Sequence, residues 1–286
     1  MIKTLSDSAL AKINLFLRVT GRRSDGYHEL DSIFVPVSIH DRLTIELRPG
    51  YSRTAALSCD APGLPSDQRN LALKAALEFM AEFDVEAKVW LTLRKQIPLG
   101  AGLGGGSSDA AAVIRMMATL CGIADAQRLS AVALRLGADV PFFLTGSPAR
   151  VRGIGEVVEP LELMHKQYVT VAVPAVEVST ASVYLDLRPE HWSGAAPESD
   201  VLDIIHGRAT QEHLVNDLER SAAARWPVIA ELKETTRAAG ARGVAMTGSG
   251  GGVFGLFDSL HEAAAAAGEI RRRAPESQVF AASILC

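Results

Sequence analysis

One stretch of this chain, residues 98–110 (PLGAGLGGGSSDA), contains five glycines within the seven positions 100–106. A strand-like run at residues 89–94 precedes it, and residues 107–120 favour a helix that begins with Ser107 and Ser108. Glycine permits positive φ and lets the backbone approach a ligand closely. The first turn of a helix presents unpaired N–H groups and the positive end of its dipole. The strand, loop and helix therefore predict a polyphosphate site.

Two other interpretations of this loop are weaker. No Gly-Lys-Ser/Thr follows at the spacing that a P-loop requires. A dinucleotide-binding loop would need a parallel βαβ unit with an acidic residue on the next strand, but the residues after Leu120 favour helix and loop instead. A loop that only joins a strand to a helix would gain nothing from so many glycines.

A second glycine loop lies at residues 246–254 (MTGSGGGVF), between two strand-like runs. A hairpin needs two or three special residues, not four glycines around a serine. The excess predicts a close approach, either to a ligand or to the first glycine loop.

The wider pattern favours a two-part α+β protein. Strand-like runs at residues 8–19, 30–39 and 42–47 precede helical patterns at 70–83, 107–120 and 129–136. After residue 168 come a strand, helices at 211–224 and 228–239, strands at 244–247 and 253–257, a helix at 260–273 and a strand at 278–284. This last order predicts a small antiparallel sheet covered on one face by helices.

Composition and charge exclude several classes. Of the residues 48% are hydrophobic and 22% are charged, which is ordinary for a globular protein, and the net charge of −4 offers no basic field for nucleic acid. Three widely spaced cysteines indicate neither a disulfide framework nor a metal site. No apolar run is long enough for a membrane span, and no leader pattern precedes the first strand. We expect a cytoplasmic protein that binds neither nucleic acid nor membrane.

Three separated segments resemble the motifs of the GHMP kinases. They are residues 9–26, with AKINL followed by GYHEL, the glycine loop GLGGGSSDAA, and the loop at 248–252. The run GADVPF at 137–142 adds to the resemblance, which covers nearly the whole chain.

The resemblance implies a two-domain α+β fold. The N-terminal domain, like domain 2 of ribosomal protein S5, would span residues 1–160 and bind ATP; a ferredoxin-like C-terminal domain would span 161–286 and bind the substrate. The active site would lie in the cleft between them. The implied reaction transfers the γ-phosphate of ATP, with Mg²⁺, to the 2-hydroxyl of a cytidine-diphosphate-linked methylerythritol in non-mevalonate isoprenoid synthesis.

By the same resemblance, Asp139 accepts the proton of the attacking hydroxyl, and Lys12 keeps Asp139 ionised and stabilises the developing charge. Without the resemblance, the simpler interpretation of Lys12 would be a solvated lysine on the polar face of a strand. That of Asp139 would be a solvated aspartate in a turn. Val140 precedes Pro141 and is biased toward an extended conformation, so we expect Asp139 on an irregular loop.

The resemblance also assigns binding residues. Tyr27 and His28 would stack on the cytosine and bond its edge, and Tyr184 would close its other face. Asn70 can equally be a helix N-cap. The implied ATP-binding residues are Asn70, Lys95, Pro98, Leu99, Gly100, Ala101, Gly102, Leu103, Gly104, Gly105, Gly106, Ser107 and Ser108; the implied substrate-binding residues are Asn14, Tyr27, His28, Thr180, Tyr184, Gly248, Ser249 and Gly250. No metal-ligating side chain is assigned.

Three alternatives stay open on the sequence. The kinase could act on mevalonate, homoserine or a sugar. The chain could be a nucleotide-binding regulator without activity, although it retains both Lys12 and Asp139. A dinucleotide-dependent oxidoreductase is the third, and binding of NAD in place of ATP would favour it.

Overall fold

The computed structural model describes all 286 residues, which form two compact units. The first unit contains Met1–Ala11, His40–Ile97 and Gly104–Gly146, and the second contains Lys12–Ile39, Pro98–Leu103 and Ser147–Cys286. Two long paired strands, β1 (Lys3–Arg22) and β2 (His28–Pro49), contribute to both units. Both units are discontinuous in sequence, and the domain boundary at residue 160 stays a prediction.

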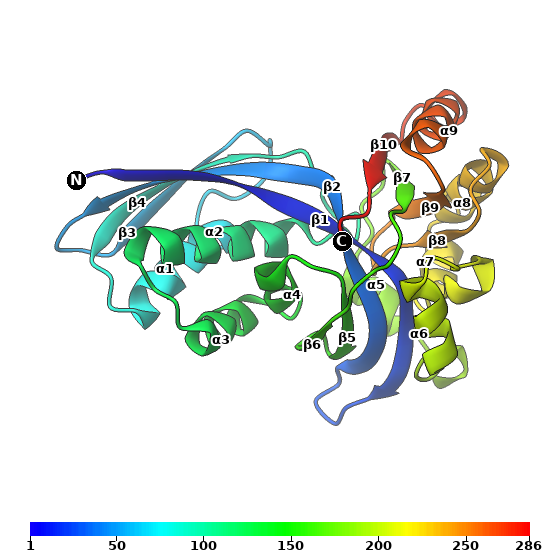
Figure 1. Ribbon diagram of the computed structural model, residues 1–286, viewed down its shortest axis with the longest axis horizontal. Coiled ribbons are helices and arrows are strands. Elements are labelled where there is room, and N and C mark those ends of the chain that lie inside the picture. Colours follow the sequence, from blue (N-terminus) through cyan, green and yellow to red (C-terminus); the bar gives the residue numbers. More distant parts are fainter. The chain divides into compact units, whose positions relative to one another are not determined.

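The first unit combines a sheet with four helices. The second half of β2 pairs antiparallel with β4 (Ala87–Arg94), which pairs in parallel with β3 (Thr54–Cys59). Alternate residues of β4 are buried, as the sequence alternation predicts, because helices lie along one face of this sheet (Figure 1). These helices are α1 (Leu71–Glu82), α2 (Gly105–Cys121), α3 (Ala126–Leu136) and α4 (Val140–Thr145).

The second unit contains the predicted antiparallel layer. Its four strands run in the order β10 (Gln278–Ser283), β7 (Tyr168–Val173), β9 (Val253–Phe257) and β8 (Val244–Met246), and all neighbours are antiparallel. Helices α8 (Val228–Ala238) and α9 (Leu260–Arg273) pack on this sheet (Figure 1). A capping box between Ser259 and Glu262 starts α9, whose alanines give it a small buried face: Ala263, Ala266 and Ala267.

The remaining elements of the second unit are short. The first half of β2 pairs with β5 (Ala149–Gly153), which pairs with β6 (Val157–Pro160). Three further helices are α5 (Thr180–Leu185), α6 (Glu198–Ile205) and α7 (Glu219–Arg225), and single 3₁₀ turns occur at Pro189–His191 and Gln211–His213.

Three local predictions are corrected. The two strands expected at 30–39 and 42–47 form one continuous strand, β2. Its first half pairs with β5 and its second half pairs with β4, so both expected segments are paired without a break between them. The helix expected at 211–224 is a 3₁₀ turn followed by α7. Val140, which was expected to be extended, is the first residue of α4, and Asp139 lies in the turn before it as the N-cap residue. Pro141 falls within the first turn of α4, where a missing N–H has no consequence, so the helix tolerates it.

None of the helices combines the length and the apolar character needed to cross a bilayer.

Candidate active site

The two glycine loops meet within the second unit. A Cβ added at Gly102 would lie 2.1 Å from the carbonyl oxygen of Thr247, and one at Gly250 would lie 2.2 Å from the backbone nitrogen of Gly102. The N–H of Gly252 donates to the carbonyl of Ala101 at 3.1 Å. Close approach to the first loop therefore explains Gly248, Gly250 and Gly252, whereas a Cβ at Gly251 would instead meet Val178 and Pro174.

The start of α2 has no side-chain cap. Its N-cap residue, Gly104, is left-handed with φ of 70°, and the first turn contains no acidic side chain. Ser107 is half-buried, and Ser108 is buried. Because its first turn contains no acidic side chain, the amides and dipole of this helix end remain suited to an anionic ligand.

A buried ion cluster lies directly beneath this helix end. The Lys95 amine contacts a carboxylate oxygen of Asp41 and lies 2.7 Å from Asp109 Oδ2, and all three side chains are more than nine-tenths buried. A Cβ at Gly105 would lie 3.3 Å from the amine, so the loop rests on the cluster. Because two carboxylates already engage the amine, contact of Lys95 with ATP stays a prediction.

Charge and burial shift the ionisation of this cluster. Burial raises the pKa of Asp109 to about 7. The positive charge of Lys95 lowers this pKa, and the negative charge of Asp41 raises it. Burial by itself would lower the pKa of Lys95, but the two carboxylates outweigh it and the net shift is upward. Asp109 Oδ1 is buried without a hydrogen-bond partner.

Lys12 is buried in the second unit, beside the first glycine loop. Its N–H donates to the carbonyl of Leu103, and its amine donates to Asn14 Oδ1 at 2.5 Å and lies 4.4 Å from the centre of the Phe34 ring. Lys12 is 3% exposed, so it is not a solvated lysine on the polar face of a strand.

Asn14 links Lys12 to the second glycine loop. Its N–H donates to the Thr247 hydroxyl at 3.0 Å, and its side-chain amide donates to the Ser32 hydroxyl at 3.0 Å. Asn14 is almost fully buried, which fixes the side chain that accepts the Lys12 bond. A contact of Asn14 with substrate stays a prediction.

Asp139 belongs to the first unit. It is half-buried at the N-cap position of α4, and its side chain makes no cap hydrogen bond. The partner role predicted for Lys12 and Asp139 stays a prediction, because the two residues are placed in different units.

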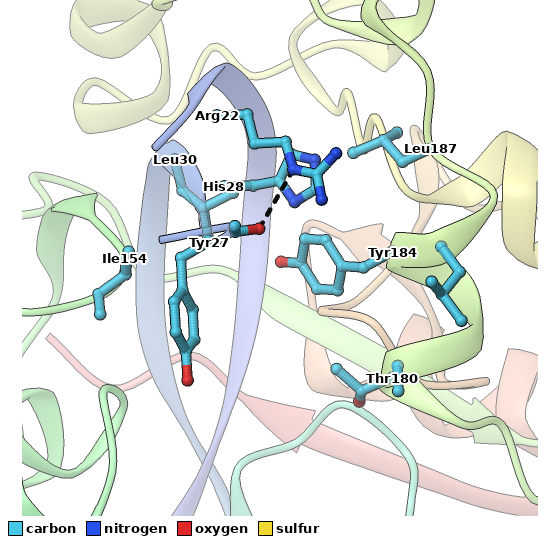
Figure 2. Close-up of a pocket in the computed structure, with 11 residues that line it drawn as sticks. Arg22, Tyr27, His28, Leu30, Ile154, Thr180, Tyr184 and Leu187 are labelled. Carbon is cyan, nitrogen blue, oxygen red and sulfur yellow. Dashed lines mark hydrogen bonds between the residues drawn. The ribbon is translucent and has the colours of Figure 1, made fainter. Parts of the chain in front are cut away.

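The second unit has a pocket of about 560 Å³ that brings together all three residues predicted to hold the base, Tyr27, His28 and Tyr184. Tyr27 and Tyr184 lie on opposite sides of it, with His28 toward one end and Thr180 toward the other (Figure 2). The lining residues are Arg22, Gly26, Tyr27, His28, Leu30, Ile154, Thr180, Ala181, Tyr184, Leu185 and Leu187.

The aromatic rings define where a base would fit. His28 and Tyr184 stack on each other with ring centres 5.3 Å apart. A base inserted between them would need roughly 7 Å, twice the ordinary contact distance of about 3.5 Å. His28 therefore covers one face of the Tyr184 ring, and the Tyr184 hydroxyl points toward Tyr27 (Figure 2).

The ionisation of His28 follows from its surroundings. Partial burial and the positive charge of Arg22 both lower the pKa of His28 below its ordinary value of 6.5. The imidazole is therefore neutral at pH 7 and has one nitrogen that can accept and one that can donate.

The remaining predicted residues take several positions. The Thr180 and Ser249 hydroxyls are 2.8 Å apart, so α5 and the second glycine loop share a contact. Asn70 is the N-cap of α1, and its Oδ1 accepts from the Ala72 N–H, which gives it a structural role. Pro98–Leu103, with Gly248 and Gly250, belong to the second unit; Gly104, Gly105 and Gly106 belong to the first.

The sequence reasoning missed several residues of these sites. Arg22 lies inside a segment that was singled out, but nothing local showed that it would line the pocket. Leu185 and Leu187 become lining residues only because α5 packs beside the β1–β2 turn. Asp41 and Asp109 had no signal, since their relation to Lys95 is entirely long-range.

Comparison with known proteins defines the class first. The family model described as GHMP kinases N terminal domain matches residues 70–147, and the one described as GHMP kinases C terminal matches residues 205–276. With the glycine loops and the two-part α+β fold, these matches define a small-molecule kinase that uses ATP.

Curated relatives narrow the class. The chain is 40% identical to 4-diphosphocytidyl-2-C-methyl-D-erythritol kinase of Geobacter metallireducens over 94% of this chain and 95% of that protein. It is 41% identical to the kinase of the same name from Citrifermentans bemidjiense, over 95% and 96%.

Solved structures agree. A crystal structure of 4-(cytidine 5'-diphospho)-2C-methyl-D-erythritol kinase is 38% identical with a TM-score of 0.84, over 98% of this chain and 99% of that one. Homoserine kinase from Cytophaga hutchinsonii shares the fold with a TM-score of 0.77 at 19% identity, over 98% and 95%. The chain therefore belongs to the GHMP kinases, and within them to the 4-diphosphocytidyl-2-C-methyl-D-erythritol kinase family.

Proposed function

We propose that this chain transfers the γ-phosphate of ATP to the 2-hydroxyl of 4-(cytidine 5'-diphospho)-2-C-methyl-D-erythritol, giving the 2-phosphate and ADP in non-mevalonate isopentenyl diphosphate synthesis. The names of the relatives at about 40% identity support this acceptor.

The ring-lined pocket is the observation that carries the choice of acceptor. Tyr27 and Tyr184 flank a space suited to a flat base, and a neutral His28 lies at its edge. Mevalonate and homoserine have no base to fill such a space. Residues before and after residue 160 both line this pocket.

In the proposed mechanism Asp139 accepts the proton of the 2-hydroxyl. That oxygen forms a bond to the γ-phosphorus while the bond from this phosphorus to the β,γ-bridging oxygen breaks, and ADP leaves with the bonding electrons. Lys12 stabilises the negative charge that develops on the transferring group. Its hydrogen bond to Asn14 holds its amine in place before substrate binds.

The phosphates of ATP would be held by the unpaired amides in the first turn of α2. Mg²⁺ fits this site as an ion that arrives with the nucleotide, because the serine side chains in the first turn of α2 are oxygen donors of the kind that Mg²⁺ takes beside phosphate oxygens. Magnesium commonly takes few protein ligands when phosphates supply others. Ser107 or Ser108 would offer a hydroxyl, and the ion would neutralise phosphate charge. A cytoplasmic location stays a prediction from the cysteine pattern.

A coupled assay of ADP release tests the proposal. The purified chain is given ATP with the cytidine-diphosphate-linked methylerythritol, mevalonate, homoserine or galactose in separate reactions. We expect turnover with the first acceptor, and ³¹P NMR of the product should show a new phosphomonoester. Turnover with another acceptor and none with the first would contradict the proposal.

A further inference from the structure

Four polar side chains of the second unit form a connected hydrogen-bond network around the amine of Lys12. Lys12 and Asn14 lie on β1, Ser32 lies on β2, and Thr247 belongs to the second glycine loop. Ser32 and Thr247 are fully buried, and Asn14 and Lys12 are 1% and 3% exposed. Bulk water does not reach these groups, so each bond depends on the partner that the fold supplies.

Ser32 decides which end of the Asn14 amide faces it. The Ser32 hydroxyl has one proton, which it donates to the carbonyl of Phe16. Its oxygen can then only accept, and it accepts from Asn14 Nδ2 at 3.0 Å. Oδ1 at the other end of the amide is thereby turned toward Lys12, whose ammonium has donors and no acceptor. A flipped amide would place its N–H groups against the ammonium.

Thr247 fixes the same amide from the second glycine loop. Its hydroxyl oxygen accepts from the backbone N–H of Asn14 at 3.0 Å, and its proton is donated to Asn14 Oδ1 at 3.3 Å. Oδ1 of Asn14 therefore accepts from Thr247 and Lys12 together, which leaves the amide one orientation that satisfies all its neighbours.

The backbone on either side of Thr247 is held by Asn216. Nδ2 of Asn216 donates to the carbonyls of Met246 and Gly248 at 2.8 and 2.9 Å. Asn216 also pairs with Leu17 of β1 in an isolated bridge. The second glycine loop and β1 are therefore connected twice, which limits the movement of the Thr247 hydroxyl relative to the amide.

We propose that Ser32 and Thr247 are positioning residues for phosphoryl transfer: their hydroxyls fix the Asn14 amide in the orientation that holds the amine of Lys12. A charge that is already in place needs no reorganisation at the moment of reaction, so side chains remote from the phosphate can still affect the rate. This inference rests on the proposed function, because it takes Lys12 as the group that stabilises the transferring phosphate.

Single variants give the first test. Ser32→Ala and Thr247→Val each remove a hydroxyl. We expect kcat to fall by roughly 10- to 100-fold with little change in either KM, because the amine acts on charge that develops only in the transition state. Thr247→Ser keeps the hydroxyl and should retain the activity. Thr236→Val is the matched control, since Thr236 is equally buried but its hydroxyl donates to Leu232 within α8.

A double-mutant cycle separates positioning from a general loss of stability. If Ser32 acts through Asn14, adding Ser32→Ala to Asn14→Ala should lower kcat no further, whereas independent effects would multiply. A further fall in the double variant would overturn the inference. Unchanged kcat in both Ser32→Ala and Thr247→Val would overturn it as well, and so would equal losses in Thr247→Val and Thr247→Ser.

Nitrogen-15 NMR without substrates tests the network apart from turnover. The ammonium signal of Lys12, identified by its absence in Lys12→Met, should exchange faster with water in Ser32→Ala and stay unchanged in Thr236→Val. If the wild type phosphorylates no cytidine-linked acceptor but Ser32→Ala releases this ammonium, the proposed function fails and the positioning of Lys12 stands. If the signal is the same in Ser32→Ala, Thr247→Val and the wild type, the inference fails whatever the turnover.

Discussion

The amine of Lys95 lies 2.7 Å from Asp109 Oδ2 under the first glycine loop, where both side chains are more than nine-tenths buried. Asp109 belongs to the helix that begins at this loop, and Lys95 follows β4. The pair therefore connects the strand end to the helix start on either side of the predicted phosphate site.

The raised pKa of Asp109 makes stability depend on pH. The folded carboxyl, with a pKa of about 7, holds a proton that the unfolded carboxyl, at about 3.8, has already released. Raising the pH from 5 to 8 should therefore shift the equilibrium toward unfolding. Asp109→Asn lacks this titration, so the free energy of unfolding of the variant should improve relative to that of the wild type as the pH rises. Urea titrations of both proteins at pH 5, 6, 7 and 8 would measure the difference.

Asp67→Asn is the matched control for that series. Its hydrogen bonds to Arg69 lower the pKa of the exposed Asp67 to about 2, so the linked stability is lost only as the pH falls through the range below 4. Between pH 5 and 8 its curve should run parallel to that of the wild type. A parallel curve for Asp109→Asn as well would rule out the titration of Asp109 in this range.

Two glycines with positive φ should respond differently to alanine. Gly102 has φ of +76° and a Cβ there would overlap the Thr247 carbonyl, whereas Gly63 has φ of +84° and nothing within 4 Å of such a Cβ. Gly63→Ala should cost only the left-handed backbone penalty of about 1–2 kcal/mol. Gly102→Ala must also separate the two glycine loops, so its thermal midpoint should fall further. Equal midpoints would show that the loops do not need this approach.

Removing either of the two proposed catalytic side chains should abolish most of the turnover. Asp139→Asn keeps the shape and loses the base, and Lys12→Met keeps the chain length and loses the charge. We expect kcat to fall by about 100- to 10,000-fold for Asp139→Asn. Asp84→Asn is the control: it replaces an exposed carboxylate that is distant in sequence from both Lys12 and Asp139, and it should keep full activity. An active Asp139→Asn enzyme would instead favour a different base.

The tyrosine pair should control acceptor binding but not ATP binding. Tyr27→Ala or Tyr184→Ala removes one stacking face, and each base stack is worth roughly 1–3 kcal/mol, so KM for the acceptor should rise by about 5- to 150-fold. KM for ATP should hardly change. Tyr51, which is almost fully exposed, is the control for loss of a tyrosine. A larger rise in the KM for ATP would mean that this pocket binds the nucleotide cofactor.

Local signals explain what could be predicted. The helices at α1, α2 and α9 follow from apolar spacing and from caps such as Asn70 and the Ser259–Glu262 box, all within a few residues. The apolar–polar alternation of β4 predicted which of its residues are buried, and the strand–strand–helix–strand order predicted the antiparallel layer. The helices and the alternation of β4 depend on neighbours in the chain, so the local sequence contains their signal.

The sequence by itself determined the glycine loops, the motif residues and the order of elements, because each depends on backbone freedom or periodicity within a short window. Only the tertiary structure decided that Lys12 is buried against Asn14, that Lys95 is held by Asp41 and Asp109, and that Arg22 lines the pocket. Burial and charge pairing arise between residues that are far apart in the chain. Their positions follow from how strands pair and helices pack, which no local pattern records.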